Sequence, residues 1–204
     1  MRYRYLTYII FAGSLVFFGA VTKFTPLKMK GSNPHTEVIS EILKDDGTFP
    51  NNEKLPLLFY EQAIELDEYD PAATMEKYFH VNHWGSSWRN GIYGFHHYHS
   101  TVHEALGIYG GKVKVQLGGP NGIIVDAEPG DVIIIPAGVA HKNLGSSPDF
   151  GVVGAYPPGQ RRDMNYGKAG ERPVADENIK NVPLPETDPV HGKPGPILVL
   201  WKTD

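Results

Sequence analysis

The sequence predicts an all-β fold, and three observations carry that prediction. The chain holds 23 glycines and 17 prolines among 204 residues, and 11% of its residues are aromatic. This density of turn-forming residues suits many short strands and does not suit a helical bundle. Short apolar segments follow one another from residue 93 to residue 156, and several alternate apolar with polar residues. Strands this short and evenly spaced are typical of a sandwich or a barrel.

The first thirty residues form a separate segment. Two arginines precede an apolar run from Tyr5 to about Thr22, and three lysines follow it. The run is about long enough to span a bilayer, which takes roughly 17–25 residues. It predicts an N-terminal apolar helix, acting either as a membrane anchor or as a cleaved signal segment of a secreted protein. The poor cleavage site at Gly19-Ala20 favours the anchor, and the sparse arginine makes a mitochondrial presequence the weaker alternative.

Short helices are expected before the main strands. The segment Glu37–Leu43, EVISEIL, places its apolar residues on one helical face and predicts a short amphipathic helix. Leu55–Tyr60 predicts a strand. Asp70 and Pro71 mark the start of a second helix, which is expected to run to about His80, because aspartate caps helices and proline suits their first position.

The remaining chain predicts one barrel domain over residues 36–201, set apart from residues 1–30. Its expected strands are Tyr93–His99, Ala105–Tyr109, Lys112–Leu117, Ile123–Ala127, Val132–Pro136 and Phe150–Tyr156. Val182–Pro196 holds five prolines and is expected to be an ordered arm lying on the barrel. The arm ends in apolar Ile197–Trp201, which needs burial, either as an added strand or in a homodimer contact.

Charge and cysteine content exclude several classes of function. From residue 31 onward the chain holds 14 basic and 23 acidic residues. Such a surface repels phosphate backbones, so no nucleic-acid partner is expected. The chain has no cysteine, which excludes disulfides and thiolate metal sites.

The stretch from Gly91 to Gly111, GIYGFHHYHSTVHEALGIYGG, holds most of a candidate metal site. In a strand, His97 and His99 project to the same face, and Glu104 follows five residues later. His141 follows a buried β-branched strand and a turn, and it is the candidate fourth ligand. Three imidazoles and one carboxylate suit divalent transition metals.

Two further histidines in this stretch are not expected to bind the metal. Strand alternation sends His96 to the face opposite His97, and His103 directly precedes Glu104. Both are expected to be exposed or packing residues, with His103 able to replace a ligand only if the turn after His99 is kinked.

These two stretches resemble the two motifs of the cupin superfamily. The first motif is Gly, five residues, His-x-His, three or four residues, Glu, six residues and Gly, and the chain fits it at every position. The second is Gly, five residues, Pro-x-Gly, two residues, His, three residues and Asn. Gly130, Pro136, Gly138 and His141 fit it, whereas Gly145 stands in place of the final Asn. The resemblance implies a double-stranded β-helix, or jelly roll, with His97, His99, Glu104 and His141 as metal ligands.

Longer runs of sequence resemble one group within the superfamily. The runs HHYHSTVHEALGIYGG, GDVIIIPAGVAHK, GAYPPGQ and VPLPETDPV are similar to the YjlB-like single-domain cupins, a group without an assigned reaction. The likeness covers roughly residues 36–201 and leaves the N-terminal segment outside. It therefore implies a fold and a metal site, and no substrate.

The ligand set leaves several chemistries open. Four protein ligands would close a tetrahedral zinc site, whereas an octahedral metal keeps two open positions for small molecules. This favours Fe, Mn or Ni, with Zn as the alternative. Three functions follow: a dioxygenase-like oxidoreductase, a metal-dependent isomerase or lyase, and a non-catalytic module that binds a small ligand.

Other residues are candidates for the walls of a ligand pocket. The aromatic candidates at its mouth are Trp84, Trp88, Tyr93 and Phe95, although aromatic side chains at strand spacing more often belong to a core. The candidates for holding a substrate carboxylate or phosphate are Arg89, Arg161 and Arg162, for which solvated surface is the default expectation.

Overall fold

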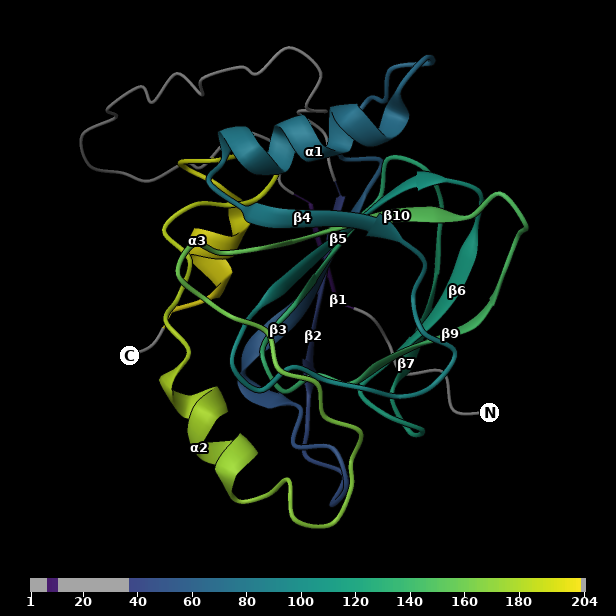
Figure 1. The fold of residues 1–204 in the computed structure, drawn as a ribbon. Helices are drawn as coiled ribbons and strands as arrows, with labels where there is room; N and C mark the ends of the chain where they lie inside the picture. Colours follow the sequence, from purple (N-terminus) through teal and green to yellow (C-terminus); the bar gives the residue numbers. More distant parts are fainter. Residues whose placement is uncertain (1–6, 11–36, 203–204) are drawn as a thin grey trace, which may run out of the picture.

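Two facing antiparallel sheets form the body of the protein (Figure 1). The computed structural model describes residues 7–10 and 37–202. The larger sheet has seven strands in the order β1-β2-β3-β8-β5-β10-β4, and the smaller has the order β7-β6-β9. The strands are β1 (Thr7–Ile10), β2 (Glu37–Leu43), β3 (Asn52–Glu61), β4 (Gly85–Asn90), β5 (Glu104–Gly110), β6 (Val113–Leu117), β7 (Ile123–Ala127), β8 (Val132–Ile135), β9 (His141–Ser146) and β10 (Gly151–Tyr156). The predicted all-β class is confirmed, and the paired sheets agree with a jelly-roll barrel.

Strand β8 lies between β3 and β5 and contributes to both cores of the protein. All four of its residues are buried. Val132 and Ile134 belong to the core on the outer face of the large sheet, whereas Ile133 and Ile135 belong to the core between the two sheets. A continuous β-branched run is what a strand covered on both faces requires.

Helix α1 (Pro71–Val81) covers one face of the large sheet, where it contacts β4, β5 and β10 (Figure 1). It begins as the sequence predicts, because the Asp70 carboxylate accepts a hydrogen bond of 2.9 Å from the Ala73 backbone N–H. Met75 packs closely on the sheet over Gly107. A Cβ at Gly107 would lie 2.3 Å from Met75 Sδ, so the close approach of helix and strand depends on glycine there.

The expected helix over Glu37–Leu43 is wrong, since this segment is strand β2. Val38 lies opposite Tyr60 of β3, and Ile39 lies opposite Phe59. Val38 packs in the outer core and Ile39 in the core between the sheets. Neighbouring apolar residues are therefore buried on opposite faces of a sheet, and pairing with β3 prevails over the helical spacing.

The predicted N-terminal helix is also wrong for the four of its residues that the structure describes. Thr7–Ile10 form β1, which pairs antiparallel with β2. The rest of the Tyr5–Thr22 run lies outside the described residues, so its role as an anchor or a signal stays a prediction. Among the helices of residues 7–10 and 37–202, none has the length and apolar character needed to cross a bilayer.

The C-terminal arm ends in a short helix rather than in an added strand. Ile197–Trp201 forms most of α3 (Pro196–Leu200) and the residue after it, and both Ile197 and Trp201 are buried within the same chain. The Trp201 indole donates a hydrogen bond of 2.8 Å to the Pro56 carbonyl in β3. The burial that the sequence required is thus supplied by β3 of the same chain.

Asp188 fixes the arm from inside the protein. Its carboxylate is fully buried and accepts hydrogen bonds from the Tyr60 hydroxyl at 2.7 Å and from the Ile197 N–H at 3.1 Å. The backbone N–H groups of Val190 and His191 each donate to its other oxygen at 2.9 Å. One side chain therefore joins β3, the proline-rich loop and α3.

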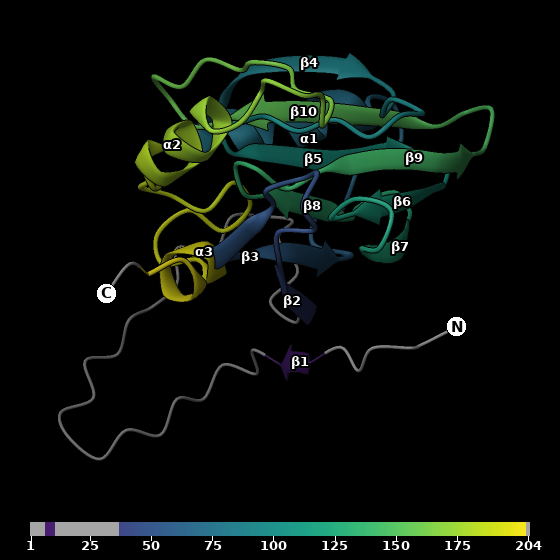
Figure 2. The same ribbon diagram turned by 90° about the horizontal axis from the view of Figure 1, so that it is seen from below.

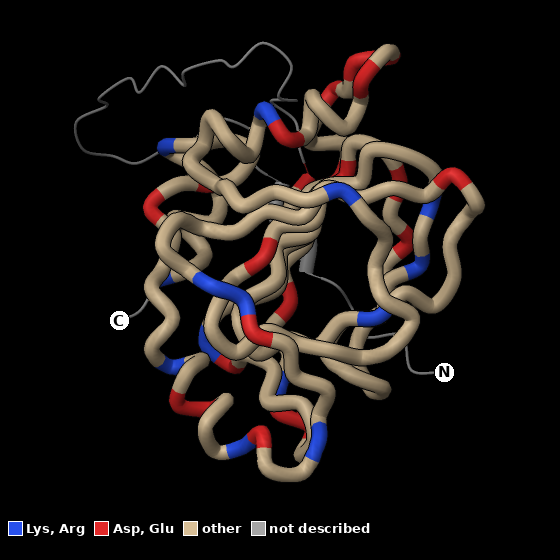
Figure 3. The backbone as a smooth tube through the Cα atoms, in the orientation of Figure 1, with Lys and Arg blue, Asp and Glu red and all other residues tan. Residues whose placement is uncertain are grey.

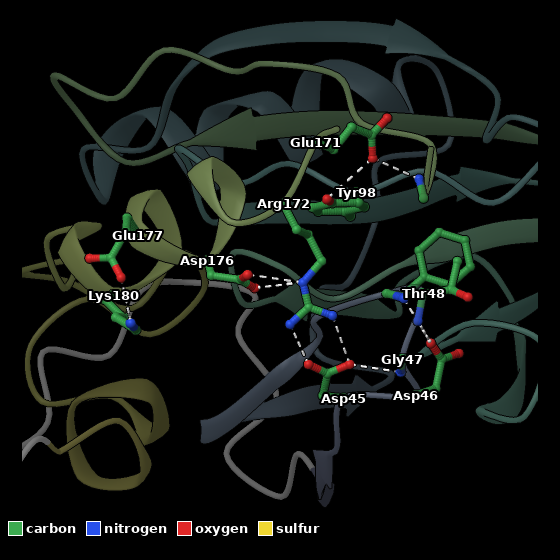
Figure 4. A network of polar contacts seen from close by, with 12 residues as sticks. Asp45, Asp46, Gly47, Thr48, Tyr98, Glu171, Arg172, Asp176, Glu177 and Lys180 are labelled. Carbon is green, nitrogen blue, oxygen red and sulfur yellow. Dashed lines mark hydrogen bonds and ion pairs between the residues drawn. The ribbon is translucent and has the colours of Figure 1, made fainter. Parts of the chain in front are cut away.

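Helix α2 (Val174–Asn181) is held against the turn between β2 and β3 by Arg172 (Figure 4). The Arg172 guanidinium lies between Asp176 of α2 and Asp45 of that turn, with closest contacts of 2.9 Å and 2.5 Å. Glu171 accepts hydrogen bonds from Tyr98 at 3.3 Å and from the Gly167 N–H at 2.8 Å. Figure 2 shows α2 and α3 at the side of the molecule away from β6 and β7.

Charged residues of both signs are spread along the described backbone (Figure 3). Acidic residues gather in the loop before α1, where residues 65–70 read ELDEYD. Elsewhere in this view basic and acidic positions are mixed. The absence of a nucleic-acid partner stays a prediction from net charge.

Candidate metal centre

The pairing of two distant backbone segments brings three candidate ligands together. His97 and His141 form an antiparallel bridge, with N–H to carbonyl distances of 3.2 and 2.9 Å. A ring nitrogen from each of His97, His99 and His141 lies within 4.8 Å of the others, and all three residues are buried. The expected strand Tyr93–His99 is wrong, because the structure forms only isolated bridges there. The side chains of His97 and His99 nevertheless point toward the same place, as the sequence predicts.

Glu104 points to the same place because of alternation along β5. It lies on the face of β5 that also carries Leu106 and Ile108 into the core between the sheets. Its Oε2 atom lies 3.3 Å from His141 Nε2 and 3.6 Å from His99 Nε2. That oxygen is buried and has no hydrogen-bond partner among the described residues. A buried, unpaired carboxylate oxygen facing imidazole nitrogens fits a bound cation.

The other oxygen of Glu104 is held by Tyr156, the last residue of β10. The Tyr156 hydroxyl lies 2.9 Å from Glu104 Oε1, 2.8 Å from Trp88 Nε1 and 3.1 Å from Arg162 Nη1. Indole and guanidinium N–H groups can only donate hydrogen bonds. The Tyr156 hydroxyl therefore accepts a hydrogen bond from each of them and donates one to Glu104. This arrangement fixes the carboxylate and leaves Oε2 for the centre.

Backbone carbonyls orient the three imidazoles. Nδ1 of His97 lies 3.3 Å from the Phe95 carbonyl, and Nδ1 of His141 lies 3.4 Å from that of Val139. His99 Nδ1 makes a short hydrogen bond with the Asp163 carbonyl. A carbonyl only accepts, so each Nδ1 carries the hydrogen and each Nε2 keeps its lone pair. This is the way proteins orient metal-binding histidines.

The protonation states suit a cation as well. Burial lowers the pKa of His97 to about 3 and also lowers the pKa of His99. Burial alone would raise the pKa of Glu104, but His99, His141 and the hydrogen bond from Tyr156 together lower it to about 2. Near neutral pH His97 and His99 are thus neutral and Glu104 is a carboxylate, the forms that bind divalent transition metals.

The two neighbouring histidines lie outside this group, as expected. His103 is fully buried, accepts a hydrogen bond of 3.0 Å from the Ala137 N–H, and packs on the Trp201 ring at 4.7 Å between centroids. His96 packs against Phe49, with ring centroids 5.5 Å apart. Both therefore act as packing residues in this structure.

Residues 160–165, called here the strap, run beside the segment that carries His97 and His99. The Asp163 carboxylate accepts from the Ser100 N–H at 2.7 Å and from the Ser100 hydroxyl at 2.5 Å. Tyr98 and Asn165 exchange backbone hydrogen bonds of 2.9 and 3.0 Å. Apart from the likeness of GAYPPGQ to the YjlB-like group, no sequence pattern indicates these contacts. The sequence therefore does not predict the roles of Tyr156 and Asp163.

A cavity of about 120 Å³ opens onto the four candidate ligands. Of the pocket residues that the sequence suggested, Trp88, Tyr93, Arg89 and Arg162 line it. Its apolar wall comes from Ile92, Leu106 and Met164. Three other candidates lie elsewhere: Trp84 is in the outer core, Phe95 stacks on Tyr93 at 4.9 Å, and Arg161 does not line the cavity.

The fold and this site together define a β-protein of two facing sheets with a buried three-histidine group. Compared with curated proteins, the chain is 41% identical over 157 residues to the uncharacterized protein YjlB of Bacillus subtilis (strain 168). The match covers 77% of this chain and 92% of that protein. The chain therefore belongs to the YjlB family. No protein-family model matches it.

Solved structures resemble the chain only weakly. Procruciferin, an 11S globulin from Brassica napus, is 13% identical with a TM-score of 0.33, over 64% of this chain and 27% of that one. Streptomyces albus HEPD with 2-hydroxyethylphosphonate and Fe(II) bound is 14% identical with a TM-score of 0.25, over 74% and 25%. A putative ethanolamine utilization protein Q from Salmonella typhimurium is 17% identical with a TM-score of 0.25, over 76% and 94%. The chain spans about a quarter of the first two, and scores this low carry no weight for fold or function.

Proposed function

We propose that this protein binds a divalent transition metal through His97, His99, His141 and Glu104 and acts there on a small molecule. The observation that carries the proposal is the convergence of three buried imidazoles, within 4.8 Å of one another, beside the unpaired Oε2 of Glu104. Fe, Mn or Ni suits this donor set with open positions, and Zn is the alternative.

The activity we propose is that of an oxidoreductase, in particular a dioxygenase-like one. A metal with open positions supplies Lewis acidity or redox chemistry when bound. An isomerase or lyase needs in addition a general base that is free to take a proton. The described residues lining the cavity offer no carboxylate or imidazole beyond the four candidate ligands. This favours oxidation over acid–base chemistry.

The protein's own residues would then prepare the site. Tyr156 and the carbonyls of Phe95, Val139 and Asp163 hold the ligands in orientation. Ile92, Leu106 and Met164 provide an apolar wall that limits water beside the centre.

Metal analysis of protein purified without a histidine tag or added metal tests the proposal. We expect close to one transition-metal ion per chain, and its loss in His99→Ala and His141→Ala variants that stay folded. A metal-free wild type that also fails to bind Fe, Mn, Ni or Zn in titrations would refute it.

Oxygen uptake separates the activities. We expect the metal-loaded protein to consume oxygen with at least one member of a panel of small organic acids. Turnover without oxygen that chelation abolishes would favour the isomerase or lyase instead. Ligand binding that persists in the His97→Ala and His141→Ala variants would favour a non-catalytic binding protein.

A further inference from the structure

One arginine at the cavity lacks a carboxylate partner among the described residues. The Arg162 guanidinium donates to the Tyr156 hydroxyl at 3.1 Å and lies 5.9 Å from the centroid of the Tyr156 ring. A guanidinium has five N–H donors, and this hydrogen bond uses one of them. Arg162 is therefore a cation with unused donors beside the candidate metal centre.

Arg89, the other arginine that lines the cavity, is different. Its guanidinium makes two hydrogen bonds to Glu76, at 2.8 and 2.7 Å, and lies 3.6 Å from Asp70. Those carboxylates neutralise it and turn its donors toward α1. Of the two, Arg162 is thus the one with donors to offer a ligand.

The backbone on both sides of Arg162 is fixed. The Arg161 carbonyl accepts a hydrogen bond of 2.7 Å from the Thr101 hydroxyl. The Asp163 side chain is held by Ser100, as described above, and by Asn165 at 2.7 Å. The backbone that carries Arg162 is thus held in place beside the cavity, and the hydrogen bond to Tyr156 directs its guanidinium toward the centre.

Distance and charge favour an anion between Arg162 and the histidines. Because Tyr156 bridges them, Arg162 Nη1 lies within about 6 Å of Glu104 Oε1. A divalent cation held by one carboxylate and three neutral imidazoles keeps a net positive charge. Together with Arg162 it makes the cavity attractive to a ligand that carries negative charge.

The lining of the cavity favours a small ligand with an apolar part. The volume of the cavity is about 120 Å³. The apolar surfaces of Ile92 and Met164 suit a short hydrocarbon portion.

We propose that Arg162 binds the carboxylate of a small organic acid and directs the other end of that acid toward His97, His99 and His141. The inference rests on the proposed metal centre and names the class of its substrate. The planar guanidinium matches a carboxylate through paired hydrogen bonds, which a lysine in its place would not reproduce.

Binding to Co(II)-loaded protein tests this inference without requiring turnover. Lactate is the probe, and lactamide is its uncharged isostere. The visible absorption of the bound cobalt reports binding, together with tryptophan fluorescence, to which Trp88 in the cavity wall contributes. We expect lactate to bind the wild type at least 10-fold more tightly than lactamide does. Arg162→Met should weaken lactate binding at least 10-fold, and Arg162→Lys should weaken it less.

Arg161→Met is the matched control, because it removes the same charge from the neighbouring position without touching the cavity. It should leave lactate binding unchanged. Equal lactate affinity in Arg162→Met and wild type, with cobalt content equal, would overturn the inference and leave the metal centre standing. Equal affinities of lactate and lactamide, or no lactate binding by the wild type, would also overturn it. Failure of the wild type to bind cobalt would overturn both proposals.

Discussion

The Tyr156 hydroxyl donates a hydrogen bond of 2.9 Å to Glu104 Oε1, and the register of two strands makes this contact possible. Strands β5 and β10 pair with Ala105 opposite Ala155, so the residues next to them, Glu104 and Tyr156, lie side by side on the inner face. A carboxylate at the start of one strand is thereby oriented by a phenol at the end of another.

Replacing Tyr156 by phenylalanine should weaken metal binding while the fold is retained. The Tyr156→Phe variant leaves Glu104 Oε1 without its donor and leaves Trp88 Nε1 and Arg162 without their acceptor. Loss of a residue that orients a metal ligand through a hydrogen bond lowers metal affinity roughly 10- to 100-fold. Competition with a chelator of known affinity measures the change. Tyr69→Phe, at a residue that is 95% exposed, is the control and should bind metal as the wild type does; equal affinities for both variants would contradict the role given to Tyr156.

Adding one methyl group at Gly154 should displace the Trp88 indole. A Cβ at this position would lie 2.2 Å from Cε2 of Trp88, the residue opposite Gly154 in the pairing of β4 with β10. We expect Gly154→Ala to lower the free energy of unfolding by about 1–3 kcal/mol and to change the tryptophan emission. Gly85→Ala in β4 is the matched control, because a Cβ there meets nothing within 4 Å. An unchanged Gly154→Ala spectrum and stability would show that the indole packs differently.

His103 should matter for stability and not for metal content. In His103→Leu the Ala137 N–H loses its buried acceptor, which costs about 1–3 kcal/mol in the free energy of unfolding. Urea denaturation measures that cost, and elemental analysis measures the metal. The variant is expected to keep the metal that His99→Ala loses. Loss of metal from folded His103→Leu would place His103 among the ligands.

Neutralising Asp188 should loosen the C-terminal arm. In the wild type one carboxylate oxygen accepts hydrogen bonds from the Tyr60 hydroxyl and the Ile197 N–H. In Asp188→Asn an NH₂ group can take the place of that oxygen, and these two buried donors then lose their acceptor. We expect a loss of roughly 2–4 kcal/mol in the free energy of unfolding, because hydrogen bonds to a charged group are the strong ones. Glu186→Gln, at a side chain that is 90% exposed, is the control and should be within about 0.5 kcal/mol of the wild type. Equal stabilities would contradict the role of Asp188.

Elements specified by local chemistry were predictable from the sequence. Helix α1 begins at its proline because Asp70 caps it, and β8 is a β-branched run between turns. Strand β2 was not predictable in the same way. Apolar residues at positions 38, 39, 42 and 43 suit one face of a helix, yet positions 38 and 39 equally suit a strand buried on both faces, and only pairing with β3 decides between them.

The candidate site likewise has a part that the sequence predicts and a part that only the fold defines. His97, His99, Glu104 and His141 follow from spacing and motif, and the structure brings these four side chains together. The residues that orient them do not carry such a signal. Tyr156 reaches Glu104 through strand register, and Asp163 reaches His99 through a strap that is more than fifty residues away in sequence. Only the folded chain defines such contacts.

The strap also orders events during synthesis of the chain. The histidines at 97, 99 and 141 leave the ribosome before Tyr156 and Asp163 do, because translation proceeds from the N-terminus. For an interval the nascent protein holds the candidate ligands without the residues that orient them. The proposed metal centre is therefore complete only after residues 156–165 have been released and have folded onto the barrel.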